Sequence, residues 1–464
     1  MAYVVCDFES RSTCDLKKAG AWVYSEDPTT EPLCLGYALD GVEVRLWTPA
    51  DPPPQDLFDA IAVGAWVIAH NALFERSMWA NVMTPGYGWP PVPDAQWYDT
   101  MASCARRALP LKLEKCGPLL RLNNVKDDEG HRAMLQLAKP QKKTGGFKED
   151  PELLAKLHDY CKADVTAEDA LLRRLRFIER PELDIWRLNQ KMNLRGIRLD
   201  LAFNQDCQVV ADRALGPLKE RFHALVGCNA GQRDKFLEWL EPRHAFPDMQ
   251  AETVKTALAD WPLPDDVRQA LIMRNAITAT SLKKLAAMRN CAGSDSRARG
   301  LIQYHGATTG RDSGRLLQPQ NFPRGKVEFG KDEDGEDVPP WEVLVPAIQS
   351  RDPETVSVML GGEPEFVTIC GRSVPFKDLD PGVAAAIRDA FPIDAVSAAL
   401  RHNIVAAPGK ALVAGDFSTI EARIVLALAG QHDRLRLIAA GADLYCDFGS
   451  VMLRDPSVSK KTHS

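Results

Sequence analysis

Asp7 and Glu9 are two carboxylates near the end of an apolar stretch that predicts the first strand of the chain. Because side chains alternate across a strand, residues two apart point to the same face. Carboxylates held so close repel each other unless a cation lies between them, so the pair favours a site for a hard divalent metal ion. A solvated acidic pair on the surface is the alternative, and the pair alone does not separate the two.

Two further segments extend this pattern. The apolar run 65–69 predicts a buried strand, and the sequence after it, Asn71 to Glu75, places Glu75 in the first turn of a helix. Tyr160 and Asp164 are four residues apart in a predicted helix and therefore share one face. An ordinary contact between tyrosine and aspartate, beside a surface acidic pair, is the alternative to a site.

In this order the three segments read D-x-E, N-x-x-x-[DE] and Y-x-x-x-D, which resembles the motifs of DEDD-type 3′–5′ exonucleases. The resemblance implies a ribonuclease H-like sheet flanked by helices and two Mg²⁺ or Mn²⁺ ions. Asp7, Glu9 and Asp164 would hold one ion, and Asp7, with Glu75 acting through water, would hold the second. Tyr160 and Glu9 would orient the attacking water. Glu75 stands where the family usually has the shorter Asp.

The overall charge hides a strongly basic segment. The chain has 57 Lys and Arg against 63 Asp and Glu, a net charge of −6, which by itself argues against a nucleic-acid partner. Between residues 268 and 326, however, eleven basic residues face two acidic ones, a net charge of +9. Such a concentration predicts a phosphate-contacting surface, with a solvated helical face as the alternative.

The basic segment contains T-T-G-R-D-S-G-R at 308–315 and Q-P-Q-N-F-P-R at 318–324. These residues resemble the T-G-R-x-S…L-Q-N-x-P block of family A DNA polymerases in its phage form. The resemblance implies that Arg311 reaches the minor groove of a primer–template and that Gln320 and Asn321 contact template and primer. Arg315, in the same block, is also expected to bind DNA.

A second block, D-F-S-T-I-E-A-R, begins at Asp416 and resembles motif A of the same polymerases, with Thr419 in place of the usual Gln. An apolar strand over 411–414 is expected to deliver Asp416 to its end. The resemblance implies that Asp416 binds catalytic magnesium ions and that Glu421, opening the next helix, excludes a ribose 2′-hydroxyl. A helix cap is the alternative role for Asp416.

Two further motifs of these polymerases, the fingers R-x₃-K…Y-G and the palm H-D-E, do not occur in the sequence. Since one carboxylate cannot organise two metal ions, we expect these residues to be incomplete for nucleotide polymerisation while retaining a complete proofreading exonuclease. Three interpretations follow: a truncated or split DNA polymerase of replication, a standalone 3′–5′ DNA exonuclease, and a non-catalytic DNA-binding half of a split polymerase. A split polymerase requires a second polypeptide that carries the fingers and the rest of the palm.

The elements that must position these residues fall into three predicted domains. Residues 1–180 alternate strands and helices, as in an α/β domain with a mixed sheet, here the ribonuclease H-like exonuclease domain. Residues 181–300 are mostly helical and form the expected thumb, and 301–464 the partial α+β palm. Predicted strands cover 3–6, 33–37, 42–47 and 65–69; predicted helices cover 71–79, 100–108, 152–177, 201–226, 251–258, 265–276, 281–290 and 421–429.

Two smaller features complete the expectations. Asp99 is expected to cap the helix that follows it, a structural role. The run 328–337 holds six carboxylates and one lysine, and it predicts a solvated loop in an insertion that extends to about residue 380.

Composition excludes several other classes of protein. With 464 residues and 10 Trp, 16 Phe and 8 Tyr, the chain can form two to four folded domains, which excludes disorder. No apolar run is long enough to span a membrane, and the N-terminus lacks a secretory signal. The eleven dispersed cysteines form no C-x-x-C motif. A reducing cytoplasm, that of the bacterial host for a phage protein, is therefore expected.

Overall fold

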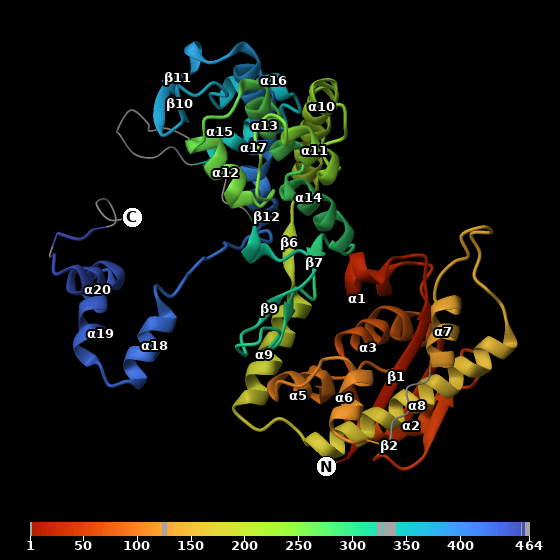
Figure 1. The fold of residues 1–464 in the computed structure, drawn as a ribbon. Coiled ribbons are helices and arrows are strands. Elements are labelled where there is room, and N and C mark those ends of the chain that lie inside the picture. Colours follow the sequence, from red (N-terminus) through yellow and green to blue (C-terminus); the bar gives the residue numbers. More distant parts are fainter. Residues whose placement is uncertain (1, 123–127, 323–326, 328–339, 456, 460–464) are drawn as a thin grey trace. The chain divides into compact units, whose positions relative to one another are not determined.

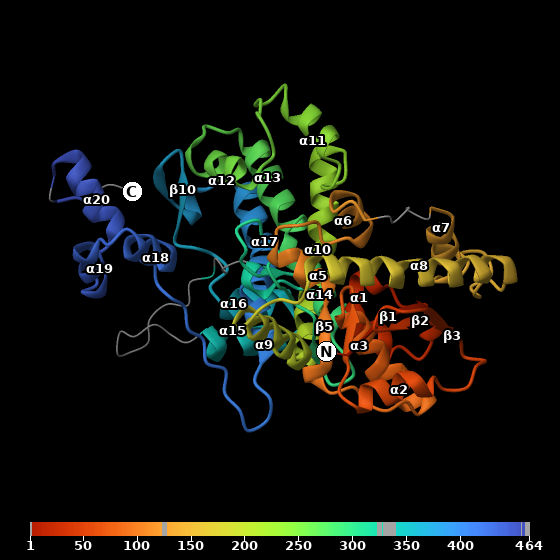
Figure 2. The ribbon, with the colours of Figure 1, turned by 90° about the horizontal axis from the view of Figure 1, so that it is seen from below.

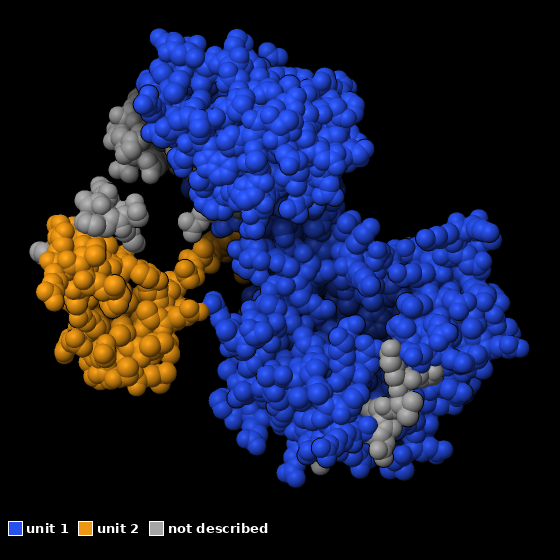
Figure 3. Space-filling model, viewed as in Figure 1, with its two compact units in different colours: residues 1–405 blue, residues 406–464 orange. Residues whose placement is uncertain are grey.

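The computed structural model describes residues 2–122, 128–322, 327, 340–455 and 457–459. The chain divides into two compact units, residues 1–405 and residues 406–464 (Figure 3). The acidic run 328–337 lies outside the described residues, so its prediction as a loop stays a prediction. No helix in the described part of the chain is long and apolar enough to cross a membrane.

A mixed five-stranded sheet, in the order β3-β2-β1-β4-β5, forms the centre of the N-terminal region. Figure 1 labels two of its strands, β1 and β2. β1 (Tyr3–Arg11) pairs antiparallel with β2 (Glu31–Leu39), which pairs antiparallel with β3 (Val44–Trp47). On its other edge β1 runs parallel to β4 (Trp66–Ala69), and β4 parallel to β5 (Trp97–Asp99). The α/β pattern and the mixed sheet expected from the sequence are therefore present.

Alternate side chains of β1 enter two different cores. One core holds Val4, Cys6 and Phe8. Val5 belongs to the other core, together with Val165 of α8 (Pro151–Leu175). Since the period of a strand is two, Asp7 and Glu9 share with Val5 the face that α8 covers. Figure 2 shows β1, β2 and β3 lying between α8 and α2.

Short helices surround the sheet. α1 contacts α3, and α8 contacts all of β1, β2 and β3. α3 continues into a π-helical segment, η1. The bounds of these elements are α1 (Leu16–Glu26), α2 (Gln55–Ala62), α3 (Leu73–Met78), η1 (Trp79–Met83), α4 (Thr84–Tyr87), η2 (Asp94–Gln96), α5 (Thr100–Arg106), α6 (Leu113–Leu119) and α7 (Asp128–Leu137).

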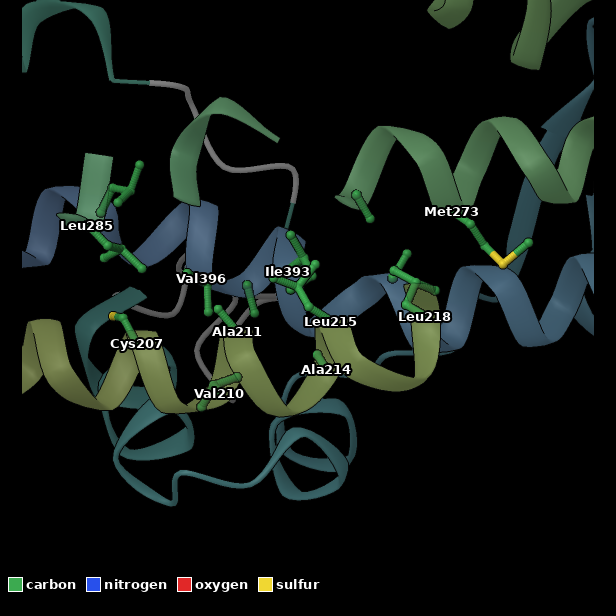
Figure 4. Packing of buried hydrophobic residues seen from close by; sticks show 14 of the residues in the cluster. Cys207, Val210, Ala211, Ala214, Leu215, Leu218, Met273, Leu285, Ile393 and Val396 are labelled. Carbon is green, nitrogen blue, oxygen red and sulfur yellow. The ribbon is translucent and has the colours of Figure 1, made fainter. Parts of the chain in front are cut away.

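The helical region that follows is built around α10 (Leu201–Val226), whose bounds agree with the prediction. Asp200 caps its first turn by accepting a hydrogen bond from the backbone N–H of Phe203, and Gly227 ends it with φ of +79°. The buried side chains of α10 recur every three or four residues and pack against α13, α14 and α17 (Figure 4).

The other helices of this region include three that follow the undescribed acidic run. Of these, α15 and α16 lie in the insertion expected to extend to about residue 380, and both pack against α10 and α17, so part of that insertion belongs to the helical core. The bounds are α9 (Glu182–Arg195), α11 (Arg233–Leu240), α12 (Ala251–Asp260), α13 (Asp265–Ile277), α14 (Thr280–Cys291), α15 (Pro340–Gln349), α16 (Pro353–Met359), η4 (Phe376–Asp378), α17 (Pro381–Ala399) and η5 (Leu400–Asn403).

Short strands connect these helices. One small sheet has the order β12-β6-β7, and β8–β9 and β10–β11 each form a separate antiparallel pair. The bounds are β6 (Ile197–Leu199), β7 (Arg297–Ala298), β8 (Ile302–Gln303), β9 (Ser313–Gly314), η3 (Pro319–Asn321), β10 (Phe366–Ile369), β11 (Arg372–Pro375) and β12 (Ile404–Val405).

The second unit corrects one expectation. The predicted strand over 411–414 is not formed, and the chain is irregular up to α18 (Ile420–Leu428). A strand needs a partner for its backbone hydrogen bonds, and none of the described residues pairs with this run; Val413 is 95% exposed. Two more helices follow, α19 (His432–Ala439) and α20 (Leu444–Leu453). Ile438 is the one buried residue among those described in this unit.

We expect limited proteolysis to cut first between residues 406 and 419, leaving a resistant fragment that ends near residue 405. The reason is that this stretch is irregular, and the unit around it exposes apolar side chains such as Phe417, 80% exposed, instead of burying a core. Mass spectrometry of the fragments measures the cut sites. A digest that leaves residues 300–464 intact would contradict the expectation.

Candidate active site

Three of the predicted carboxylates come together between the sheet and α8. Asp7 and Glu9 come from β1 and Asp164 from α8, and one ligand oxygen of each lies within 4.8 Å of the others. The strand alternation and the packing of Val5 against Val165 explain the convergence, because they turn the acidic face of β1 towards α8. The three groups lie 157 residues apart at most in sequence and become neighbours only in the folded sheet.

Tyr160 and Glu75 stand beside this cluster. The Tyr160 hydroxyl hydrogen-bonds Asp164, and burial, followed by the charge of Asp164, raises the pKa of Tyr160. Glu75, in the first turn of α3, is 2% exposed, and the charge of Asp7 acts on it. The five residues of the three exonuclease-like motifs therefore lie in one region of the molecule.

The three carboxylates of the cluster are half-buried. Burial raises the pKa of Asp7, Glu9 and Glu75 well above their ordinary values, and a neighbouring carboxylate raises each further: Asp164 for Asp7, and Asp7 for the other two. Among the described residues, Asp7 Oδ2 and Glu75 Oε2 are buried with no hydrogen-bond partner. Orphaned carboxylate oxygens are the ligands that Mg²⁺ and Mn²⁺ prefer, so the residues present fit such ions.

Asp99 has the structural role expected for it, and a second one. It caps α5 by accepting a hydrogen bond from the Met101 N–H at 2.8 Å. It also accepts one from the Asn71 N–H at 2.9 Å, which holds Asn71 in a left-handed conformation, φ +73°. Burial raises the pKa of Asp99 to about 6, against the effect of these hydrogen bonds. Asp99 thus positions the loop that leads to Glu75.

Glu168 is an acidic residue near the cluster that the sequence interpretation missed. It is 2% exposed and accepts a hydrogen bond from Thr100 Oγ1 at 2.9 Å. Burial, then the charge of Asp7, raises its pKa well above the ordinary value. The signal was present in the sequence, because Tyr160, Asp164 and Glu168 recur at intervals of four on one face of α8.

A cleft of about 990 Å³ opens beside Tyr160 and Asp164. Its lining includes residues of α6, α7 and α8, together with residues of the β8–β9 pair and Arg315. The wall-forming residues include Leu113, His131, Met134, Gln303 and Arg315. The cleft therefore joins the carboxylates of the N-terminal sheet to part of the polymerase-like block, both within residues 1–405.

The other residues of that block lie outside this cleft. Arg311, Gln320 and Asn321 are exposed, and Gln320 lines a smaller cavity of about 230 Å³. Asp312 is held in place, since its carboxylate accepts hydrogen bonds from Asn189 Nδ2 at 2.8 Å and from the His305 N–H at 3.0 Å. The block is thus a loop in which Arg315 lines the large cleft and Arg311 does not.

The basic segment contributes less free positive surface than its charge count predicts. Arg268 is 3% exposed and donates to the Trp261 carbonyl at 3.1 Å. Arg299 pairs with Asp295 at 2.6 Å, and Arg289 donates to Asn204 Oδ1 at 2.6 Å. These guanidinium groups satisfy internal acceptors and are not available for phosphates. The basic residues at 324 and 326 lie outside the described part of the chain.

The motif A residues are not joined by other acidic groups. Asp416 is exposed in the irregular stretch before α18, and Glu421, in the first turn of α18, is exposed as well. In the described ranges, the one group of three or more potential metal ligands is that of Asp7, Glu9 and Asp164. The second unit therefore presents Asp416 as a single carboxylate.

Comparison with known proteins supports the polymerase resemblance. A DNA polymerase of Bacillus phage SP02 is 28% identical to the chain over 470 residues, covering 97% of the chain and 65% of that polymerase. The resemblance to a DNA polymerase that the motifs indicate is therefore confirmed. The chain spans about 65% of the length of this curated relative.

One solved structure shows a weaker likeness. The POL domain of Pol1 from M. smegmatis, in complex with DNA primer-template and dNTP, has a TM-score of 0.43 and 16% identity to the chain. The match covers 86% of this chain and 83% of that one. No protein-family model matches the chain.

Substitution of Asp164 by Asn tests the electrostatics of the cluster. A carboxylate whose folded pKa is raised costs stability once the pH exceeds its unfolded pKa near 4, so removing one charge at pH 7 relieves repulsion. Without divalent metal we expect D164N to be more stable than wild type by about 1 kcal/mol at pH 7 and by less at pH 5, where raised pKa values leave the folded cluster with less negative charge to repel. Urea unfolding at both pH values measures this.

The same variant tests metal binding. Millimolar Mn²⁺ should raise the Tm of the wild type at pH 7, because it binds the folded state, and should leave the Tm of D164N nearly unchanged. Asp59→Asn, which changes an exposed carboxylate of α2, is the matched control and should behave as wild type. Equal Mn²⁺ shifts in D164N and wild type would show that the cluster does not bind the ion.

Proposed function

We propose that the N-terminal region is a metal-dependent 3′–5′ exonuclease that acts on DNA, within a family A-type DNA polymerase. The convergence of Asp7, Glu9 and Asp164 with the Tyr160 hydroxyl carries this proposal. The mixed sheet with helices on both faces supports a ribonuclease H-like assignment for the region. The phage relative, a DNA polymerase, supports DNA as the substrate.

The roles proposed for the side chains are those that the exonuclease resemblance implies. Divalent ions held by the carboxylates would supply charge stabilisation and a water of lowered pKa for cleavage of the terminal phosphodiester. Asp7, Glu9 and Asp164 would ligate one ion, and Asp7, with Glu75 acting through water, the second. The raised pKa of Tyr160 keeps its hydroxyl protonated, so Tyr160 orients the attacking water by hydrogen bonding and does not act as its base.

We propose that the polymerase-like blocks contact primer–template DNA. Arg311, Gln320 and Asn321 are exposed, as a minor-groove contact requires. The acceptors of the minor groove differ little between base pairs, which suits a sequence-independent grip. Asp416 would bind magnesium and Glu421 would exclude the 2′-hydroxyl. DNA replication is the process that the phage relative suggests.

We do not expect residues 1–464 alone to polymerise nucleotides. The sequence lacks the R-x₃-K…Y-G and H-D-E motifs, and the chain corresponds to 65% of its relative's length. A standalone exonuclease and a DNA-binding half completed by a second polypeptide are the alternatives. Among the described residues, Asp416 belongs to no group of three potential metal ligands. This favours both alternatives over DNA synthesis by residues 1–464 alone.

The exonuclease proposal is tested by shortening of a 5′-labelled single-stranded oligonucleotide in Mg²⁺ or Mn²⁺. We expect Asp7→Ala to lower the rate roughly a thousandfold, because it removes a ligand expected for both ions. Asp59→Ala, an exposed carboxylate of the same domain, should cleave at the wild-type rate. A wild type that leaves the oligonucleotide intact with both metals, or D7A cleaving like wild type, would contradict the proposal.

Primer extension tests the polymerase side. With magnesium, all four nucleotides and a primed template, residues 1–464 should show no sustained extension, since the groups that grip the triphosphate and the second palm metal are missing from the sequence. The D7A variant is the suitable protein for this assay because it removes competing degradation. Extension by many nucleotides would refute this expectation.

A further inference from the structure

Arg315 lies at the wall of the cleft beside the carboxylate cluster, although its sequence block resembles a polymerase motif. Its Nη1 donates to Gln303 Oε1 at 3.1 Å and to Asn71 Oδ1 at 3.4 Å. Asn71 belongs to the second exonuclease-like motif, which Asp99 holds in place. The arginine is therefore attached to the loop that leads into Glu75, and it faces the same space as Tyr160.

The hydrogen bonds that Arg315 makes to the described residues go to neutral amide oxygens, and the charge of Asp99 acts on it without forming an ion pair. Its side chain is exposed to the cleft, while the protein atoms around it lower its pKa by desolvation. Other arginines of the basic segment satisfy internal groups, as Arg299 does with Asp295. A guanidinium that faces a cleft, with donors left over after its two amide contacts and no carboxylate hydrogen-bonded to it among the described residues, is suited to bind a phosphate.

The rest of the cleft fits a single nucleic-acid strand. Leu113, Met134 and the rings of His131 and Tyr160 offer apolar and aromatic surface on which bases can lie, and these two rings are 6.4 Å apart. The volume of about 990 Å³ is at the upper end of ligand pockets, enough for the end of a strand and too small for a double helix. The carboxylates at one end repel phosphates, so a cationic side chain elsewhere in the cleft is needed.

We infer that Arg315 binds the phosphodiester backbone of the single strand whose 3′ end enters the carboxylate cluster. The polymerase-like block would then supply one wall of the exonuclease substrate site, and Arg315 would differ in role from Arg311. The inference rests on the proposed exonuclease function, and it specifies which DNA strand the residue holds.

Binding of a short 5′-fluorescein single-stranded DNA, followed by anisotropy in EDTA over a range of KCl concentrations, tests the inference without cleavage. Arg315→Ala should weaken binding about tenfold at low salt and reduce the slope of log K against log salt by about 0.7, the value for one lost phosphate contact on a single strand. Arg315→Lys should keep the slope, because it keeps the charge. A residue with only a structural role would not change the slope.

Two controls make the result specific. Arg372→Ala changes an exposed arginine of β11 that does not line the cleft, and it should bind as wild type. Binding of a blunt duplex should be the same for R315A and wild type. Thermal unfolding checks that R315A is folded. If R315A is not folded, the assay uses Arg315→Gln, whose side chain can still hydrogen-bond Gln303 and Asn71.

The inference is overturned if R315A, or R315Q in its place, keeps the wild-type affinity and salt slope for the single strand. Equal losses for single strand and duplex would also overturn it, since Arg315 would then grip the duplex. Its failure is distinct from failure of the exonuclease proposal. If D7A abolishes cleavage while the Arg315 variants bind normally, only the inference fails. If the wild type does not cleave while R315A loses one phosphate contact, only the exonuclease proposal is contradicted.

Discussion

The mutual repulsion of Asp7, Glu9 and Asp164 is the constraint on which the N-terminal architecture depends. Three half-buried carboxylates with oxygens within 4.8 Å of one another repel, and the fold must hold them there. Packing supplies that restraint: β1 is buried on both faces, and Val5 packs in one core with Val165, one residue after Asp164. The stability of the sheet and α8 offsets the electrostatic cost, and a divalent ion would remove it.

A second set of contacts extends the site beyond the sheet. Asp99 fixes the backbone of Asn71, and Asn71 accepts from Arg315, so the loop before Glu75 is connected to a segment more than 240 residues later. Further contacts join the same parts of the first unit, including Ser294 N–H to Glu26 at 2.8 Å. The cleft exists because these parts meet. Removing the helical region would therefore open one wall of the site while leaving its carboxylates in place.

Local patterns in the sequence predicted most of the elements near the site. The period of two in β1 and the spacing of four in α8 place the acidic residues correctly, and α10 begins and ends at the predicted residues. The prediction of a strand over 411–414 was wrong, because an apolar run forms a strand only when a neighbouring strand pairs with its backbone N–H and C=O groups. The net charge of the basic segment also overstated the positive surface available to phosphates, since Arg268 is buried against backbone carbonyls.

By itself the sequence determined which carboxylates form the candidate site and the resemblance to a phage DNA polymerase, because motif spacing on one strand or one helix is a local property. The tertiary structure alone decided which charges are neighbours. It brought Glu168 near Asp7 and placed Arg315 beside Asn71, away from the role that its own block suggests. Such contacts depend on how distant elements pack against one another, and no local periodicity encodes that packing.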